Sequence, residues 1–109
     1  MGTLIYGGSD ISVPFDDRTL AHLQIVIGRK LRRRERFFLS WIDTTAVGNG
    51  RASVWIDTSI MLRFRYQHAR PVDINPEWLE LLMDSANTAA GLTYVSEPGD
   101  DVGTVRRRA

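Results

Sequence analysis

The spacing of hydrophobic residues changes along the chain, and each period predicts an element. Residues 3–6 and 11–15 alternate as short strands do, and the turn-rich segment between them predicts an amino-terminal β-hairpin. A three-to-four-residue period then predicts an amphipathic helix that begins at Asp16 or Asp17, with His22 on its polar side. Its hydrophobic stripe consists of Leu20, Leu23, Ile27 and Leu31.

Beyond this helix the pattern alternates again. We predict strands over residues 36–42, 51–57 and 61–66, joined by short loops into an antiparallel meander with a turn at Asn49-Gly50. A second helix is predicted to begin at Asn75, which suits an N-cap before Pro76, and to stop at Gly91. Residues 92–95 are predicted to form a last strand, and residues 96–109 a flexible tail.

The predicted order of elements is ββαβββαβ. Each amphipathic helix needs an apolar surface, and one face of an antiparallel sheet supplies it. We therefore predict a two-layer α+β sandwich with both helices on one face of the sheet, folded as a single domain over residues 1–95.

The amino-acid composition excludes several classes of function. Without cysteine, the chain has no disulfide, no thiolate nucleophile and no cysteine-bound zinc. No apolar run approaches the ~20 residues that span a bilayer, so we expect no membrane partner. The first residues lack the pattern of a signal peptide. A cytoplasmic protein is the expectation.

The sequence carries no catalytic pattern that we can assign. His22 and His68 have no neighbours at the spacing of a metal site or a catalytic triad, and we expect both to be solvated. Gly48-Asn49-Gly50 joins two strands and suits a hairpin better than a phosphate-binding loop. We predict a non-enzymatic protein without cofactor or metal. A small hydrolase or transferase would require a pocket that gathers His68 or His22 with carboxylates.

Two basic features suggest binding instead. Six of the eight residues from Arg29 to Arg36 are cationic, which suits phosphate contact or, equally, a solvated helix end with cations at the negative pole. Arg51, Trp55, Arg63 and Arg65 are predicted to share the outer sheet face, which Phe38 would extend. This face suits base stacking, a protein interface, or arginine stems that simply cover the indole.

The predicted binding residues form one set for either partner. They are Arg29, Lys30, Arg33, Arg51, Trp55, Arg63 and Arg65. The first hypothesis is a nucleic-acid-associated accessory protein, and the alternative is a protein-interaction or homo-oligomerisation module that uses the same sheet face.

Several segments resemble a known group of proteins. These are residues 1–7, residues 17–23, Phe38-Leu39-Ser40-Trp41, residues 50–55 and Asn75-Pro76-Glu77-Trp78. Together they resemble a family of small uncharacterised actinobacterial, Microbacteriaceae-like proteins that often carry the label "ATP-dependent DNA ligase". The resemblance implies an actinobacterial or phage source. Ligases use a lysine in a Lys-x-Asp-Gly motif, whereas the only lysine here, Lys30, precedes Leu31-Arg32-Arg33, so no catalytic residue is carried over.

Overall fold

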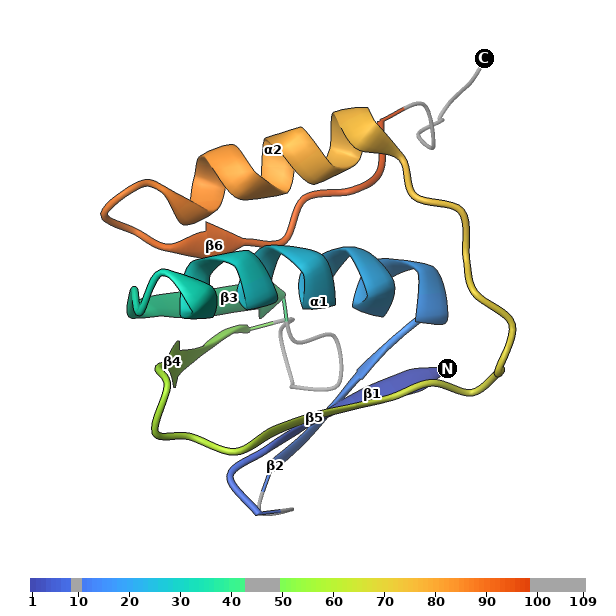
Figure 1. Ribbon diagram of the computed structural model, residues 1–109, viewed down its shortest axis with the longest axis horizontal. Helices are drawn as coiled ribbons and strands as arrows, with labels where there is room; N and C mark the ends of the chain where they lie inside the picture. The colour runs from blue at the N-terminus through green and yellow to red at the C-terminus, as the bar shows by residue number, and fades with distance from the viewer. Residues whose placement is uncertain (9–10, 43–49, 99–109) are drawn as a thin grey trace. The chain divides into compact units, whose positions relative to one another are not determined.

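The computed structural model describes residues 1–8, 11–42 and 50–98. Its elements follow the order ββαβββαβ, which confirms the α+β class and the predicted order (Figure 1). The strands are β1 (Gly2–Tyr6), β2 (Ile11–Phe15), β3 (Phe37–Ile42), β4 (Arg51–Ile56), β5 (Leu62–Arg65) and β6 (Leu92–Thr93), and the helices are α1 (Asp17–Arg32) and α2 (Pro76–Ala86). Asn49 of the predicted Asn49-Gly50 turn and most of the predicted tail fall outside the described residues.

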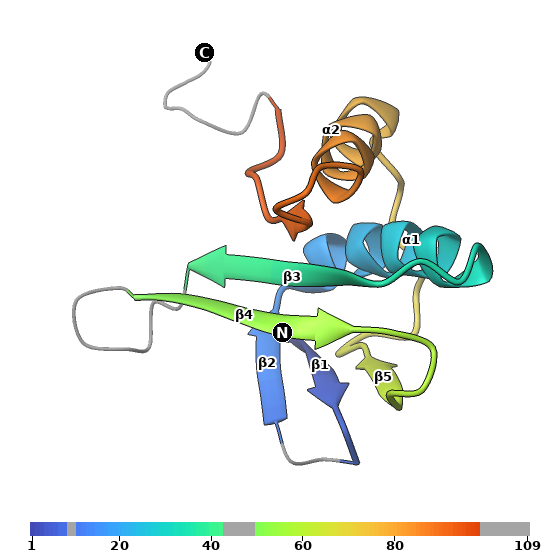
Figure 2. The same ribbon diagram turned by 90° about the vertical axis from the view of Figure 1, so that its left-hand side faces the viewer.

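The strands divide between two three-stranded sheets, where the sequence predicted one antiparallel sheet. One sheet has the order β2-β1-β5 and the other the order β4-β3-β6, in which Figure 2 shows β3 beside β4. β5 pairs with β1 and not with its predicted neighbour β4; Phe64 stands opposite Leu4 in an antiparallel register. β6 pairs in parallel with β3, with Leu92 opposite Leu39. Alternation fixes which side chains face inward, but it does not choose the partner strand.

The chain forms two compact units, each with one helix. The first contains β1, β2, α1 and β5, and the second contains β3, α2, β6 and most of β4. Buried hydrophobic side chains of the first unit are Leu4, Ile5, Val13, Phe15, Leu20, Leu23, Val26, Ile27 and Ile56. Buried side chains of the second unit are Phe37, Leu39, Trp78, Leu82, Ala86 and Leu92. The single domain over residues 1–95 stays a prediction.

Helix α1 buries a wider arc than its leucine and isoleucine stripe predicts. His22 is fully buried and Lys30 is 5% exposed, so the expectation of a solvated His22 is wrong. The His22 Nδ1 lies 2.7 Å from the Arg18 carbonyl oxygen. A carbonyl can only accept, so Nδ1 carries the proton. The burial follows because Thr19, His22 and Val26 extend the stripe at helical spacing.

The helix ends differ in how well the sequence marks them. The Asn75 side chain accepts hydrogen bonds from the Glu77 and Trp78 amides, so the predicted cap of α2 is confirmed. The helix stops at Ala86, short of the predicted stop at Gly91. Gly91 has φ +88°, and a Cβ there would lie 2.5 Å from the Phe38 carbonyl oxygen, so glycine is required by both conformation and space.

Candidate functional site: a cationic groove beside α1

A segment without regular secondary structure, residues 66–74, runs from β5 along α1 and is bonded to it at both ends. The Tyr66 hydroxyl donates to the Gln24 side-chain oxygen at 2.5 Å. Farther on, the Arg18 guanidinium donates to the Asp73 carbonyl oxygen, also at 2.5 Å. We call residues 66–74 the strap. Because both contacts lie within the first unit, the position of the strap on α1 follows from that unit alone.

Asp17, the first residue of α1, fixes the start of the strap. Its carboxylate accepts hydrogen bonds from the backbone amides of Gln67, at 3.0 Å, and His68, at 2.9 Å. The Gln67 amide is the main reason that the pKa of Asp17 lies below its ordinary value; the His68 amide and charge add to the effect, and partial desolvation opposes it. The sequence suggested only a helix cap here. The structure shows a carboxylate that joins two elements 50 residues apart.

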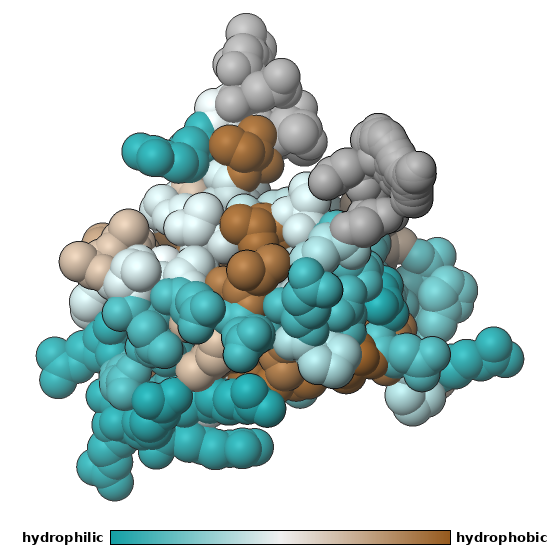
Figure 3. Space-filling model, turned by 90° about the horizontal axis from the view of Figure 1, so that it is seen from above, coloured by the Kyte–Doolittle hydropathy of each residue, from teal (hydrophilic) through white to brown (hydrophobic). Residues whose placement is uncertain are grey.

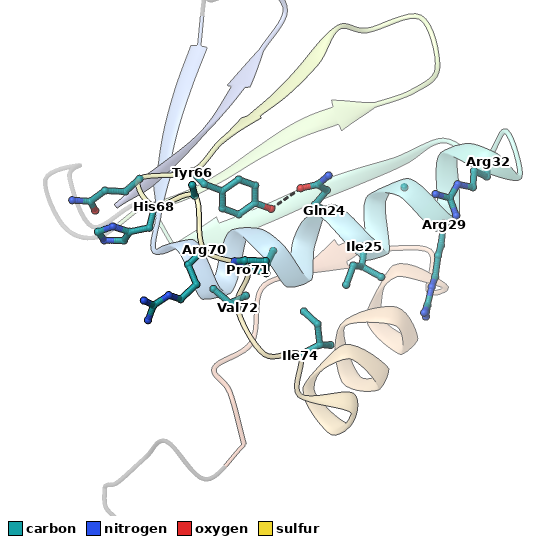
Figure 4. Close-up of a pocket in the computed structure, with 14 residues that line it drawn as sticks. Gln24, Ile25, Arg29, Arg32, Tyr66, His68, Arg70, Pro71, Val72 and Ile74 are labelled. Carbon is teal, nitrogen blue, oxygen red and sulfur yellow. Dashed lines mark hydrogen bonds between the residues drawn. The ribbon is translucent and has the colours of Figure 1, made fainter.

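The strap and α1 enclose a groove with a volume of about 1000 Å³. On the helix side, its lining residues recur at helical spacing, because one face of α1 forms the wall. The lining residues are Ala21, Gln24, Ile25, Gly28, Arg29 and Arg32 from α1, and Tyr66 to Val72 with Ile74 from the strap. Figure 4 shows Arg29 and Arg32 at one end, His68 and Arg70 at the other, and hydrophobic side chains between them.

The groove carries one sign of charge. Its described lining residues include three arginines and one histidine, and none of them is aspartate or glutamate. Arg29, Arg32 and Arg70 are all exposed. Within the wall, burial and the nearby Asp17 charge raise the pKa of Tyr66, which keeps this hydroxyl protonated as a donor to Gln24. The groove therefore offers hydrogen-bond donors and positive charge above an apolar floor, which suits a ligand that is anionic and partly apolar.

The residues of the predicted basic run, Arg29 to Arg36, have different environments in the structure. Arg29 lines the groove, together with Arg32, which the sequence did not single out. Lys30 is buried and pairs with Glu35, its Nζ 2.5 Å from the carboxylate, and Arg33 lies 3.5 Å from the same carboxylate. The hydrogen bond from Lys30 is the main reason that the pKa of Glu35 is lowered. Lys30 therefore contributes to the folding of the first unit.

The residues of the predicted arginine and tryptophan face lie on strands of two different sheets. Arg63 and Arg65 are exposed on β5, opposite Ile5 and Thr3 of β1. Arg51 and Trp55 are exposed on β4, which belongs to the other sheet.

The indole of Trp55 already has an anionic neighbour. Its Nε1 donates to the Asp57 carboxylate at 3.3 Å. That carboxylate also accepts from the Ser59 amide and hydroxyl, which chiefly lower the pKa of Asp57.

Hydrophobic side chains also reach the surface, and Figure 3 shows one such group between hydrophilic side chains. On β3 and β4, the Ser40 and Ser53 hydroxyls lie 2.7 Å apart, which places them on one face of the sheet. Alternation puts Phe38 and Ile42 on the face of Ser40, and they are 46% and 57% exposed. Trp55 is also 40% exposed, on the part of β4 that belongs to the first unit.

Metal and membrane features are absent from the part of the chain that the structure describes. There, no three side chains among His, Asp and Glu come together as metal ligands. Within the same residues, no helix has the length and hydrophobicity needed to cross a bilayer. His68 lies in the groove, whose described lining residues include no aspartate or glutamate; the carboxylate next to it is that of Asp17, which accepts from the His68 backbone amide.

The fold and the groove define a small α+β protein with a cation-lined surface groove. The chain belongs to the family described as "Domain of unknown function (DUF7882)", whose sequence profile matches residues 1–97. No curated protein and no solved structure matches the chain. Membership of an uncharacterised family agrees with the resemblance found in the sequence, whereas the actinobacterial source and the ligase label stay predictions.

Proposed function

We propose that the chain is a non-enzymatic module that binds nucleic acid through the groove beside α1. The observation that carries the proposal is the set of three arginines and one histidine among described lining residues without a carboxylate. Planar guanidinium groups donate two hydrogen bonds at once to phosphate oxygens, and such contacts hold the backbone without reading sequence. A cysteine-free chain also suits a reducing compartment, the cytoplasm, where nucleic acids are available.

The salt dependence of binding tests this function. Each phosphate contact with a single strand changes the slope of log K against log salt by roughly −0.7, so three arginines predict a slope of about −2. Changing Arg29, Arg32 or Arg70 to alanine should reduce the slope by about 0.7 each. Fluorescence anisotropy with a labelled oligothymidylate, titrated at several salt concentrations, measures both affinity and slope.

A charge-matched variant locates the contact. Arg29→Glu should weaken binding strongly, whereas Arg63→Glu, the same change on the exposed face of β5, should leave it nearly unchanged. Equal losses in the two variants would mean that the contact is not confined to the groove, and a larger loss in Arg63→Glu would move it to the β5 face. Binding that is absent in the wild type, or indifferent to salt, would refute the proposal.

A second function, protein interaction or self-association, is favoured by a separate observation. Phe38 and Ile42 are 46% and 57% exposed on one face of β3. Exposed hydrophobic groups of this kind are common in interfaces between proteins. This face lies outside the groove, so the two functions are tested by different variants.

A further inference from the structure

Gly28 occupies a position where the helix itself would be more stable with alanine. It lies within α1, four residues from the helix end, and glycine lowers helix stability in such interior positions. No tight packing among the described residues explains it: a Cβ built at Gly28 meets no atom within 4 Å. This differs from Gly2 and Gly91 in the same chain, where a Cβ would lie 2.8 Å and 2.5 Å from other atoms.

The space above Gly28 belongs to the groove. Gln24, Gly28 and Arg32 form one row along α1, and this row lines the groove on one side. On its other side lies a second hollow of about 360 Å³, which the same three residues share with Ile60, Leu62 and others. Since the middle residue of the row has no side chain, the row is lowest at Gly28, and a ligand can approach the helix backbone there.

The side chains around this low point have two chemistries. Ile25, Val72 and Ile74 form an apolar floor, while Arg29 and Arg32 stand at one end of the groove and Arg70 at the other (Figure 4). A ligand that fits all of them needs a flat, weakly polar part in the middle and negative charges on both sides. An unpaired nucleotide within a strand has this form, since its base lies between two phosphates. A duplex offers its phosphates but keeps its bases stacked inside.

We propose that the groove beside α1 takes a single-stranded nucleic acid, with an unpaired base over Gly28 and the flanking phosphates at Arg29, Arg32 and Arg70. This inference rests on the proposed function and adds the class of nucleic acid and the place of the base. It assigns Gly28 a role in ligand binding: its missing side chain leaves room for the base.

Filling that room tests the inference without removing any charge. Gly28→Leu places an aliphatic side chain in the groove, and leucine favours a helix more than glycine does, so the variant should be at least as stable as the wild type. Loss of the contacts that one base makes with the groove floor is expected to lower the affinity for oligothymidylate about tenfold, the order that a single bound base contributes elsewhere. Gly28→Ala, which adds only a methyl group, should lose much less. Thermal unfolding followed by circular dichroism verifies that both variants fold.

Several outcomes separate this inference from the proposed function. If Gly28→Leu binds like the wild type while Arg29→Glu binds weakly, the inference is overturned and the function stands. If neither the wild type nor a variant binds the strand, both fail. Equal affinity for the matching duplex would overturn the assignment of an unpaired base. The same conclusion would follow if polyglutamate competed with the strand and Gly28→Leu also abolished the binding of polyglutamate. Should Gly28→Leu not fold, Ile25→Ser keeps all cations and is expected to weaken binding several-fold.

Discussion

At the scale of single residues, Arg34 adopts a backbone conformation that the sequence does not predict. Its φ is +59°, in the left-handed region, and it directly follows the cap residue Arg33 of α1. The Glu35 amide donates to the Lys30 carbonyl and the Arg34 amide to the Leu31 carbonyl, which is the hydrogen-bond pattern of a Schellman motif. Glycine is the usual residue at this position because an L side chain is strained there.

Replacing Arg34 by glycine should therefore stabilise the protein by about 0.5–1 kcal/mol. Urea unfolding followed by tryptophan fluorescence measures the change in the free energy of unfolding. Arg33→Gly is the matched control, because Arg33 has φ −90° and contacts Glu35, so glycine should bring no gain there. Equal effects of the two changes would show that the left-handed conformation is not the source of strain.

Asp17 predicts a dependence of stability on pH. Its pKa is lowered in the folded chain, chiefly by the Gln67 amide, and an unfolded aspartate titrates at about 3.9. A lowered pKa means that the folded state favours the ionised form, so the stabilisation is fully present above ~4 and is lost as the pH falls through the folded pKa.

The Asp17→Asn variant should consequently be less stable than the wild type at neutral pH, and the gap should narrow below about pH 4. Unfolding temperatures measured across this range test the prediction. Asp84→Asn, the same chemical change at an exposed position of α2, should leave the profile of the wild type nearly intact. A gap that stays constant with pH would mean that the Asp17 carboxylate does not act through its charge.

At the scale of elements, the sequence predicts what depends on local spacing. The start of α2 at Asn75-Pro76 and the alternation of β4 follow from neighbouring residues, and both are found in the structure. The end of α2 is less local. Ala89 and Ala90 continue the helical pattern, but the chain instead turns so that Gly91 can lie against the backbone of Phe38. That contact joins residues far apart in sequence, so no window of the sequence contains it.

The candidate site shows the same division. The basic run predicts cations near the end of α1, and helical spacing explains why Arg29 and Arg32 lie on the groove face while Lys30 is buried. Arg70 lies in an irregular segment without periodicity, so its place opposite α1 depends on Asp17 and Arg18 holding the strap. Local patterns give the helix wall of the groove, and only tertiary contacts give the other wall.

At the scale of the whole molecule, charge and hydrophobic groups are distributed unevenly. The formal net charge is only +1, yet the charged residues in the described lining of the groove are all cationic. Phe38 and Ile42 expose hydrophobic surface elsewhere, on β3. A near-neutral protein has little long-range repulsion between copies, so this exposed surface is expected to decide whether copies associate.

If this face mediates self-association, the mass in solution should rise with concentration, and a Phe38→Ser, Ile42→Ser double variant should stay monomeric. Buried aromatic and aliphatic anchors each contribute enough that one change should weaken a dimer about tenfold. Sedimentation velocity measures the mass. Leu81→Ser is the control, since Leu81 is a similarly exposed residue, 44%, on α2. A wild type that remains monomeric at high concentration argues against self-association. The groove would then be left as the better supported binding site, because its arginines do not depend on a second copy.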